Sequence, residues 1–240
     1  MWARAGRAGS GAVSRQVGGV AGPADGAALR AATRANYDRL ARWYGVLVDP
    51  VDRHAQAVGL RLLSARSGER VLEVGCGTGG ALCEIADAVG SSGRAVGVEL
   101  SPRMAARAVR RIGDRDLVAS ALVVVAGAPP LPFTDAAFDA VYMSFTLEVL
   151  QPASLRTALL AECRRVLVRG GRLVCVSVSA REPAGLASRA YRVLQRHLGS
   201  IVDCAPIRAA GLAADAGFMV TDSLDLRLWG LPVDVIRANP

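Results

Sequence analysis

The chain has 240 residues, 52% of them hydrophobic and 21% charged, which is enough for one large domain with a full hydrophobic core. No apolar run approaches the roughly 20 residues that span a bilayer, so we expect a soluble protein without stable membrane insertion. The net charge of +8 is a weak sign of a nucleic-acid partner, because residues 1–35 carry half of it and all 29 basic residues are arginine. We therefore expect no nucleic-acid partner.

The five cysteines form neither a C-x-x-C pair nor a metal-ligand spacing with the two histidines. An odd count without a pattern is typical of buried thiols in a reducing compartment. We expect no metal site and a cytoplasmic location.

Residues 1–26 contain seven glycines and one large aromatic residue, Trp2, which is too little apolar surface to offset the entropy of ordering. We expect a disordered tail. An organellar transit peptide is the alternative, because Asp25 is the one acid beside three arginines. The seven glycines argue against the amphipathic helix that such a peptide needs.

Apolar residues at helical spacing predict two helices next, over 27–48 and about 51–65. We expect both to form an N-terminal helical lid, residues 27–66, beside the glycine-rich turn that follows. Tyr37 and Tyr44 are candidates for the lining of a substrate pocket in this lid, and a place in the hydrophobic core is the alternative for both.

The segment VLEVGCGTGG, residues 71–80, indicates a strand (70–74), a tight turn and a helix from about 79 to 90. Glycine suits such a turn because it accepts positive φ and lets a ligand approach the backbone, where the N–H groups of the helix's first turn face it. The glycine spacing satisfies both the dinucleotide pattern G-x-G-x-x-G and the tighter G-x-G-x-G. Spacing alone does not choose the ligand.

Glu73 indicates which kind of ligand the turn binds. A carboxylate two residues before Gly75 would repel the pyrophosphate of a dinucleotide, whereas it suits a ligand with an ammonium and a sulfonium. S-adenosylmethionine (SAM) carries both groups. The residues therefore favour SAM over NAD.

The rest of the chain alternates strands and helices, which predicts right-handed crossovers and a parallel sheet. Glu99 ends the second strand, where an acid can accept both ribose hydroxyls of an adenosine; a helix-flanking acid is the alternative. The expected elements are a strand 94–99, a helix 102–112, a strand 122–125, a loop 129–139, a strand 140–144, a helix 152–168, a turn 169–172, a strand 173–179, helices 184–198 and 205–216, and a closing hairpin of strands 218–228 and 231–236.

Four segments, taken in order, resemble the class I SAM-dependent methyltransferases, and within them the branch related to ubiquinone and menaquinone C-methyltransferases (methyltransferase type 11). They are VLEVGCGTGG (71–80), GVELSP (97–102), LPFTDAAFDAVYMSF (131–145) and ECRRVLVRGGRLVCVSVS (162–179). The resemblance covers about residues 35–240. It implies an α/β fold, a Rossmann-like seven-stranded mostly parallel sheet with helices on both faces and a C-terminal antiparallel hairpin, and a methyltransferase domain over residues 67–240.

The resemblance also implies where SAM would bind. Glu73 would hold the methionine ammonium and Glu99 the ribose, while Leu100 and Met104 would pack on adenine. Family members usually carry an adenine-binding acid where this chain has Gly127, so that contact is missing. The expected cofactor-binding residues are Glu73, Gly75, Cys76, Gly77, Gly79, Glu99, Leu100, Met104, Gly127, Ala128, Ser144 and Phe145.

The implied activity is methyl transfer to a small, apolar or aromatic acceptor, quinol- or phenol-like, at carbon or oxygen. A sulfonium methyl is already activated, so a general base is not compulsory. His54, Glu148 and His197 are the candidates for one, with the alternatives that His54 is solvated and that Glu148 only caps or solvates the following helix. Two other functions stay open: a catalytically silent SAM-binding or partner-binding protein, and an NAD(P)-dependent oxidoreductase.

Overall fold

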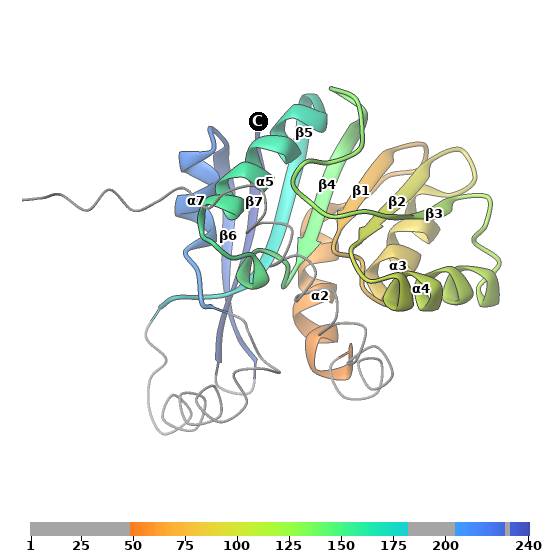
Figure 1. Ribbon diagram of the computed structural model, residues 1–240, viewed down its shortest axis with the longest axis horizontal. Helices are drawn as coiled ribbons and strands as arrows, with labels where there is room; N and C mark the ends of the chain where they lie inside the picture. The colour runs from red at the N-terminus through yellow and green to blue at the C-terminus, as the bar shows by residue number, and fades with distance from the viewer. Residues whose placement is uncertain (1–48, 182–204, 229–230) are drawn as a thin grey trace, which may run out of the picture.

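The computed structural model describes residues 49–181, 205–228 and 231–240 (Figure 1). They form a seven-stranded sheet in the order β3-β2-β1-β4-β5-β7-β6. Six strands point the same way, and β7 alone of the seven runs antiparallel, between β5 and β6. The strands are β1 (Arg70–Val74), β2 (Arg94–Glu99), β3 (Ala121–Val125), β4 (Phe138–Ser144), β5 (Leu167–Val178), β6 (Met219–Leu228) and β7 (Leu231–Asn239). The expected mostly parallel sheet with a closing hairpin is confirmed.

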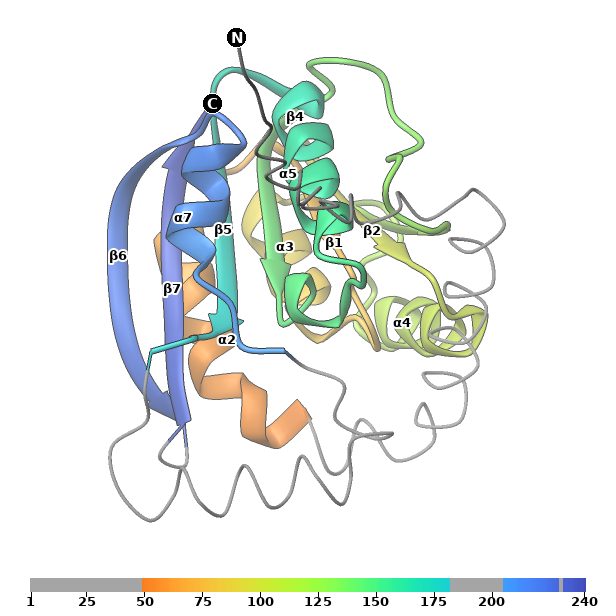
Figure 2. The ribbon, with the colours of Figure 1, turned by 60° about the vertical axis from the view of Figure 1, so that its left-hand side comes forward.

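Helices cover both faces of the sheet, as expected. Figure 2 shows α5 (Ser154–Val166) and α7 (Ala209–Asp215) in front of the sheet and α2 (Asp49–Leu63) and α3 (Gly80–Val89) behind it. The two sides of each strand supply two separate hydrophobic clusters, because side chains alternate along a strand. α4 (Pro102–Asp114) packs beside α3 and against β2 and β3.

The structure describes the second half of the expected lid as helix α2, which covers one face of the sheet. α2 packs on β4, β5 and β7, and its Ala55 and Leu63 are 1% and 0% exposed. Gly59 allows the close approach, since a Cβ there would lie 2.5 Å from Cγ2 of Val176. The apolar stripe signalled that the helix is buried, but not which surface buries it. Residues 27–48, with Tyr37 and Tyr44, lie outside the described residues, as does the helix expected at 184–198.

The turn expected at 169–172 is part of β5. That strand starts at Leu167, and its pairing with β4 is irregular: Phe138 is opposite Leu167, whereas Ala140 is opposite Arg172. Gly170 has a φ of +80°, which lets the chain bulge without leaving the sheet. The glycines therefore mark an irregularity within a strand, and α5 ends sooner than expected, at Val166.

The described part of the chain contains no helix that is both long enough and apolar enough to cross a membrane. The described cysteines, Cys76, Cys83, Cys163 and Cys175, are all buried free thiols. Burial raises the pKa of each, which keeps the thiols protonated and unreactive at neutral pH.

Candidate cofactor-binding site

A pocket lies at the carboxyl edge of the sheet, where β1, β2 and β4 end. This is the edge at which open α/β sheets bind ligands. The segment after β3, the short helix η1 (Leu147–Val149) and the start of α5 complete its wall. Nine of the twelve residues predicted to bind the cofactor line it: Gly75, Gly77, Glu99, Leu100, Met104, Gly127, Ala128, Ser144 and Phe145.

The turn after β1 has the conformation that its glycines predict. Gly75, Gly77 and Gly79 have φ values of +74°, +54° and +80°, where other residues are strained. The N–H groups of Gly75 and Cys76 both donate to the carbonyl of Val98 on β2, at 2.8 and 3.1 Å. A Cβ on Gly77 would meet no atom within 4 Å, so the turn borders open space at that point. The backbone is thus accessible to a ligand there.

Glu99 is fixed at the end of β2 by the backbone around it. Its Oε2 accepts the N–H of Gly77 at 3.0 Å, and its Oε1 accepts the N–H of Ser101 at 2.8 Å. Ser101 in turn caps α4, as predicted, because its Oγ accepts the N–H of Met104. These two N–H groups hold the carboxylate at the pocket, whose lining includes Glu99.

Glu73 lies beneath the glycine turn rather than in the pocket wall. It is 4% exposed, and no described group donates a hydrogen bond to its Oε2. Burial, and then the charge of Glu99, raises the pKa of Glu73 well above its usual range. A buried carboxyl with an unsatisfied oxygen is costly, and a cationic group of a ligand would relieve that cost. This observation suits the ammonium of SAM and does not suit a pyrophosphate.

Cys76 and Gly79 also lie behind the pocket lining. The thiol of Cys76 packs on the face of β2 over Gly97, since a Cβ on Gly97 would lie 2.6 Å from its Sγ. A Cβ on Gly79 would lie 2.8 Å from Cβ of Ala108, so this glycine lets α4 approach the turn. Both residues shape the turn, and neither is part of the pocket lining.

The side of the pocket expected to hold adenine is apolar. Leu100 and Met104 line it, and Met104 is only 1% exposed. Opposite them run Gly127 and Ala128, in a segment whose first N–H, from Ala126, donates to the carbonyl of Glu99 at 3.0 Å. No acid stands in this segment, so adenine would be held by packing and by backbone groups.

The end of β4 contributes a residue that the sequence did not single out. Thr146 lines the pocket, and its Oγ1 lies 3.0 Å from the carbonyl oxygen of Val74 and 3.2 Å from that of Ser144. Its side chain fills the space beside Gly75, where a Cβ would come within 2.6 Å of Oγ1. Phe145, just before it, has a φ of +52°, a strained value that a phenylalanine seldom adopts.

Five further lining residues after the fourth strand were also missed: Val149, Leu150, Gln151, Leu155 and Leu159. They follow the fourth strand in the chain, at the edge where ligands bind, and that position was the available signal. Apart from the amide of Gln151, their side chains make this wall of the pocket apolar.

Neither of the two described candidates for a general base, His54 and Glu148, lines the pocket. His54 is exposed on α2, and His197 lies outside the described residues. Glu148 is 0% exposed, and its Oε1 accepts the N–H of Val178 at the end of β5. The Glu148 carboxyl thereby attaches η1 to the sheet.

Comparison with known proteins agrees with this geometry. Residues 71–171 match the methyltransferase domain family. A demethylmenaquinone methyltransferase of Beutenbergia cavernae is 38% identical over 148 residues, which are 60% of this chain and 56% of that protein. An O-methyltransferase of Penicillium expansum is 31% identical over 179 residues, 73% of this chain and 61% of that protein. The chain spans about half the length of the curated relatives that it matches.

Solved structures share the fold. A SAM-dependent methyltransferase from Aquifex aeolicus superposes with a TM-score of 0.64 at 17% identity, covering 84% of this chain and 97% of that chain. The matched domain, its relatives and the shared fold agree on one assignment, and the cofactor of that group is S-adenosylmethionine. The chain therefore belongs to the class I SAM-dependent methyltransferases.

Proposed function

We propose that the protein transfers a methyl group from SAM to a small, apolar or aromatic acceptor. The observation that carries the proposal is a single pocket with two unlike halves. One half presents the carboxylate of Glu99 and the glycine turn, and the other is walled by Leu155, Leu159 and Val149. The first half suits an adenosine and a methionine chain, and the second suits an apolar acceptor.

SAM, when bound, would supply a methyl group already activated on a sulfonium, and the protein would supply position and exclusion of water. Glu99 would accept the ribose hydroxyls, and Glu73 would face the methionine ammonium directly or through a water. Leu100 and Met104 would enclose the adenine. Ser144 and Phe145 would border the methionine part and the acceptor.

The described lining contains one ionisable side chain, Glu99, and we assign that residue to the cofactor. The lining therefore supports an uncharged, apolar acceptor such as a quinol or a phenol. The proton that this acceptor loses on methylation would leave to solvent, because Glu99 is assigned to the cofactor. The names of the relatives, a demethylmenaquinone methyltransferase and an O-methyltransferase, point the same way.

A labelled-methyl assay tests the proposal. The full chain is incubated with methyl-labelled SAM and a panel of phenols and reduced quinones, and label is counted in the organic extract. We expect label in at least one aromatic acceptor and none in polar controls such as free nucleosides. Binding of SAM without transfer to any acceptor of the panel would contradict this function and would favour a SAM-binding protein without turnover.

A further inference from the structure

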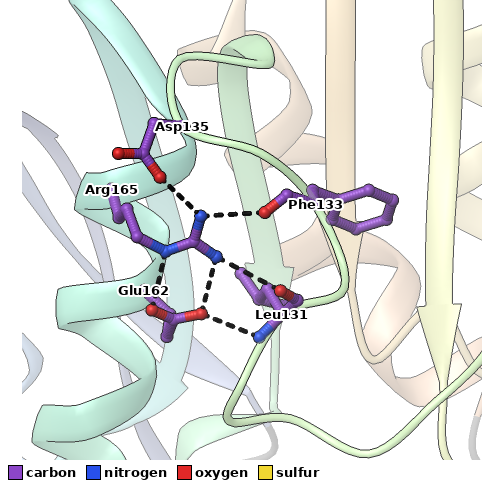
Figure 3. Close-up of polar contacts among 5 residues, drawn as sticks. All are labelled: Leu131, Phe133, Asp135, Glu162 and Arg165. Atoms are coloured by element: carbon purple, nitrogen blue, oxygen red, sulfur yellow. Dashed lines mark hydrogen bonds and ion pairs between the residues drawn. The ribbon is translucent and has the colours of Figure 1, made fainter.

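Arg165 on α5 joins that helix to the segment that precedes β4 (Figure 3). Its Nε and one terminal nitrogen donate to Oε1 and Oε2 of Glu162, both at 2.8 Å. The guanidinium also donates to the carbonyls of Phe133 and Leu131, at 2.8 and 3.2 Å, and to the carboxylate of Asp135 at 2.8 Å. Every donor of one side chain is thus directed at Glu162 or at residues 131–135.

Leu131 is held at both of its backbone polar groups. Its N–H donates to Oε2 of Glu162 at 2.9 Å, and its carbonyl accepts from Arg165. The Leu131 side chain is 3% exposed in the core below. A rigid guanidinium with five donors can hold such an arrangement, whereas a lysine ammonium has no planar fork.

The segment that Leu131 terminates is a wall of the pocket. Ala126, Gly127 and Ala128 line the pocket, and two prolines follow before Leu131. The start of this segment is fixed by the hydrogen bond from Ala126 to the carbonyl of Glu99. Its other end is fixed by Arg165 and Glu162. Because proline restricts φ, a displacement of Leu131 is passed toward Ala128 instead of being absorbed between them.

We propose that Arg165 is a positioning residue for the cofactor: by fixing Leu131 it sets the distance between residues 126–128 and the opposite wall at Leu100 and Met104. This inference rests on the proposed function only in taking SAM as the ligand. Arg165 itself does not line the pocket. It acts through the backbone, and Glu162 acts with it.

The charge of Asp135 contributes little to this effect. Its side chain is 80% exposed, and exposed ion pairs are weak because water and salt screen them. The Glu162 carboxyl is 21% exposed, and its hydrogen bond with Arg165 lowers its pKa. The carbonyls and Glu162, rather than Asp135, are therefore the partners on which the position of Leu131 depends.

The chain offers a matched control, Arg172, whose partners lie outside the pocket lining. Arg172 makes the same kind of arrangement: two hydrogen bonds to Glu69, at 2.9 and 2.6 Å, and two to the carbonyls of Leu63 and Ser64. It fixes the turn between α2 and β1, at the amino end of the strands. Loss of Arg172 should cost stability without altering the pocket.

The test compares Arg165→Gln with Arg172→Gln by calorimetry of SAM and S-adenosylhomocysteine binding at 10 °C, with the melting temperature of each variant measured in parallel. We expect Arg165→Gln to raise both dissociation constants at least fivefold. Arg172→Gln should change them less than twofold, although its melting temperature should fall by at least as much as that of Arg165→Gln. Arg165→Lys should behave like Arg165→Gln, because it restores the charge without the planar fork. Glu162→Gln keeps an acceptor for Leu131 and should give a smaller increase.

If Arg165→Gln does not fold, Glu162→Gln takes its place in the comparison with Arg172→Gln. Equal dissociation constants for the α5 variant and the Arg172 control would overturn the positioning role. A wild-type protein that binds neither ligand would instead contradict the proposed function, so the two failures are distinguishable.

Discussion

The backbone N–H of Gly77 donates to Oε2 of Glu99 at 3.0 Å, so one carboxylate connects the glycine turn after β1 with the end of β2. The same carboxylate lines the pocket and accepts a second N–H, from Ser101. Glu99 therefore holds the turn in place, and in the proposed function it also accepts the ribose hydroxyls of SAM.

Glu99→Ala is expected to weaken SAM binding at least tenfold. The variant loses charge-assisted hydrogen bonds worth about 1.5–3 kcal/mol each, and the glycine turn loses an anchor. Calorimetry measures the effect, with Glu84→Ala as the control because Glu84 is an exposed carboxylate that pairs with Arg115 away from the pocket. If Glu99→Ala binds SAM as tightly as the wild type, then Glu99 does not contact the ligand.

Glu73→Gln is expected to change stability and affinity in opposite directions. Because the pKa of Glu73 is raised in the folded state, its contribution to stability is full below the ordinary carboxyl pKa and is lost as the pH rises toward the raised value. At neutral pH the amide variant without ligand should therefore be more stable than the wild type, by about 1–3 kcal/mol, and the difference should shrink toward pH 4. Its SAM affinity should fall, because the ammonium loses its partner.

Denaturant unfolding at several pH values, together with calorimetry, checks both parts of this prediction. At a pH where the free protein holds Glu73 protonated, binding of SAM should release that proton, seen as a binding enthalpy that depends on the buffer, and Glu73→Gln should remove this contribution. A variant that loses stability and gains affinity would show that Glu73 is charged and paired in the free protein.

The strands of this fold were largely predictable because the evidence for each is local. β2 occupies 94–99, as expected, and the helix after it begins at the predicted cap, Ser101. Buried β-branched runs, glycine turns and capping residues all act within a few positions of the chain. Nine predicted site residues meet in one pocket for the same reason, since they follow strands that end at one edge.

The rest depended on contacts between segments that are far apart in sequence. The position of α2 on the sheet depends on the close contact of Gly59 with Val176. The position of the Thr146 side chain depends on its hydrogen bond to Val74, which lies 72 positions earlier in the chain. Arg165 reaches partners about 30 positions away. No periodicity within one segment encodes such pairs. In the sequence alone, these residues look like part of an ordinary helix surface or loop.

Gly75→Ala and Thr146→Ala are expected to be energetically coupled. Alanine at 75 is strained by its φ of +74°, at a cost of about 1–3 kcal/mol, and its Cβ would also overlap Oγ1 and Cγ2 of Thr146. Thr146→Ala removes that overlap at the cost of one hydrogen bond. In a double-mutant cycle of unfolding free energies the double variant should be more stable than the sum of the singles, by about 1 kcal/mol. Additive values would mean that the two side chains do not meet.

Gly127→Asp is expected to tighten SAM binding by about 0.5–1.5 kcal/mol, or about 2- to 12-fold, by offering the adenine amino group an acceptor. Gly127 is not among the described residues with positive φ, so backbone strain does not oppose the change. Gly127→Ala isolates the effect of adding a Cβ. If alanine is neutral and aspartate brings no gain, then Gly127 does not lie beside adenine.

The central claim is that the pocket at the carboxyl edge takes SAM, and calorimetry of the wild-type protein with SAM, S-adenosylhomocysteine and NAD tests it most directly. The buried, unsatisfied carboxyl of Glu73 and the carboxylate of Glu99 predict micromolar binding of both adenosyl compounds and no heat from NAD. Micromolar binding of NAD without any heat from SAM would contradict the account.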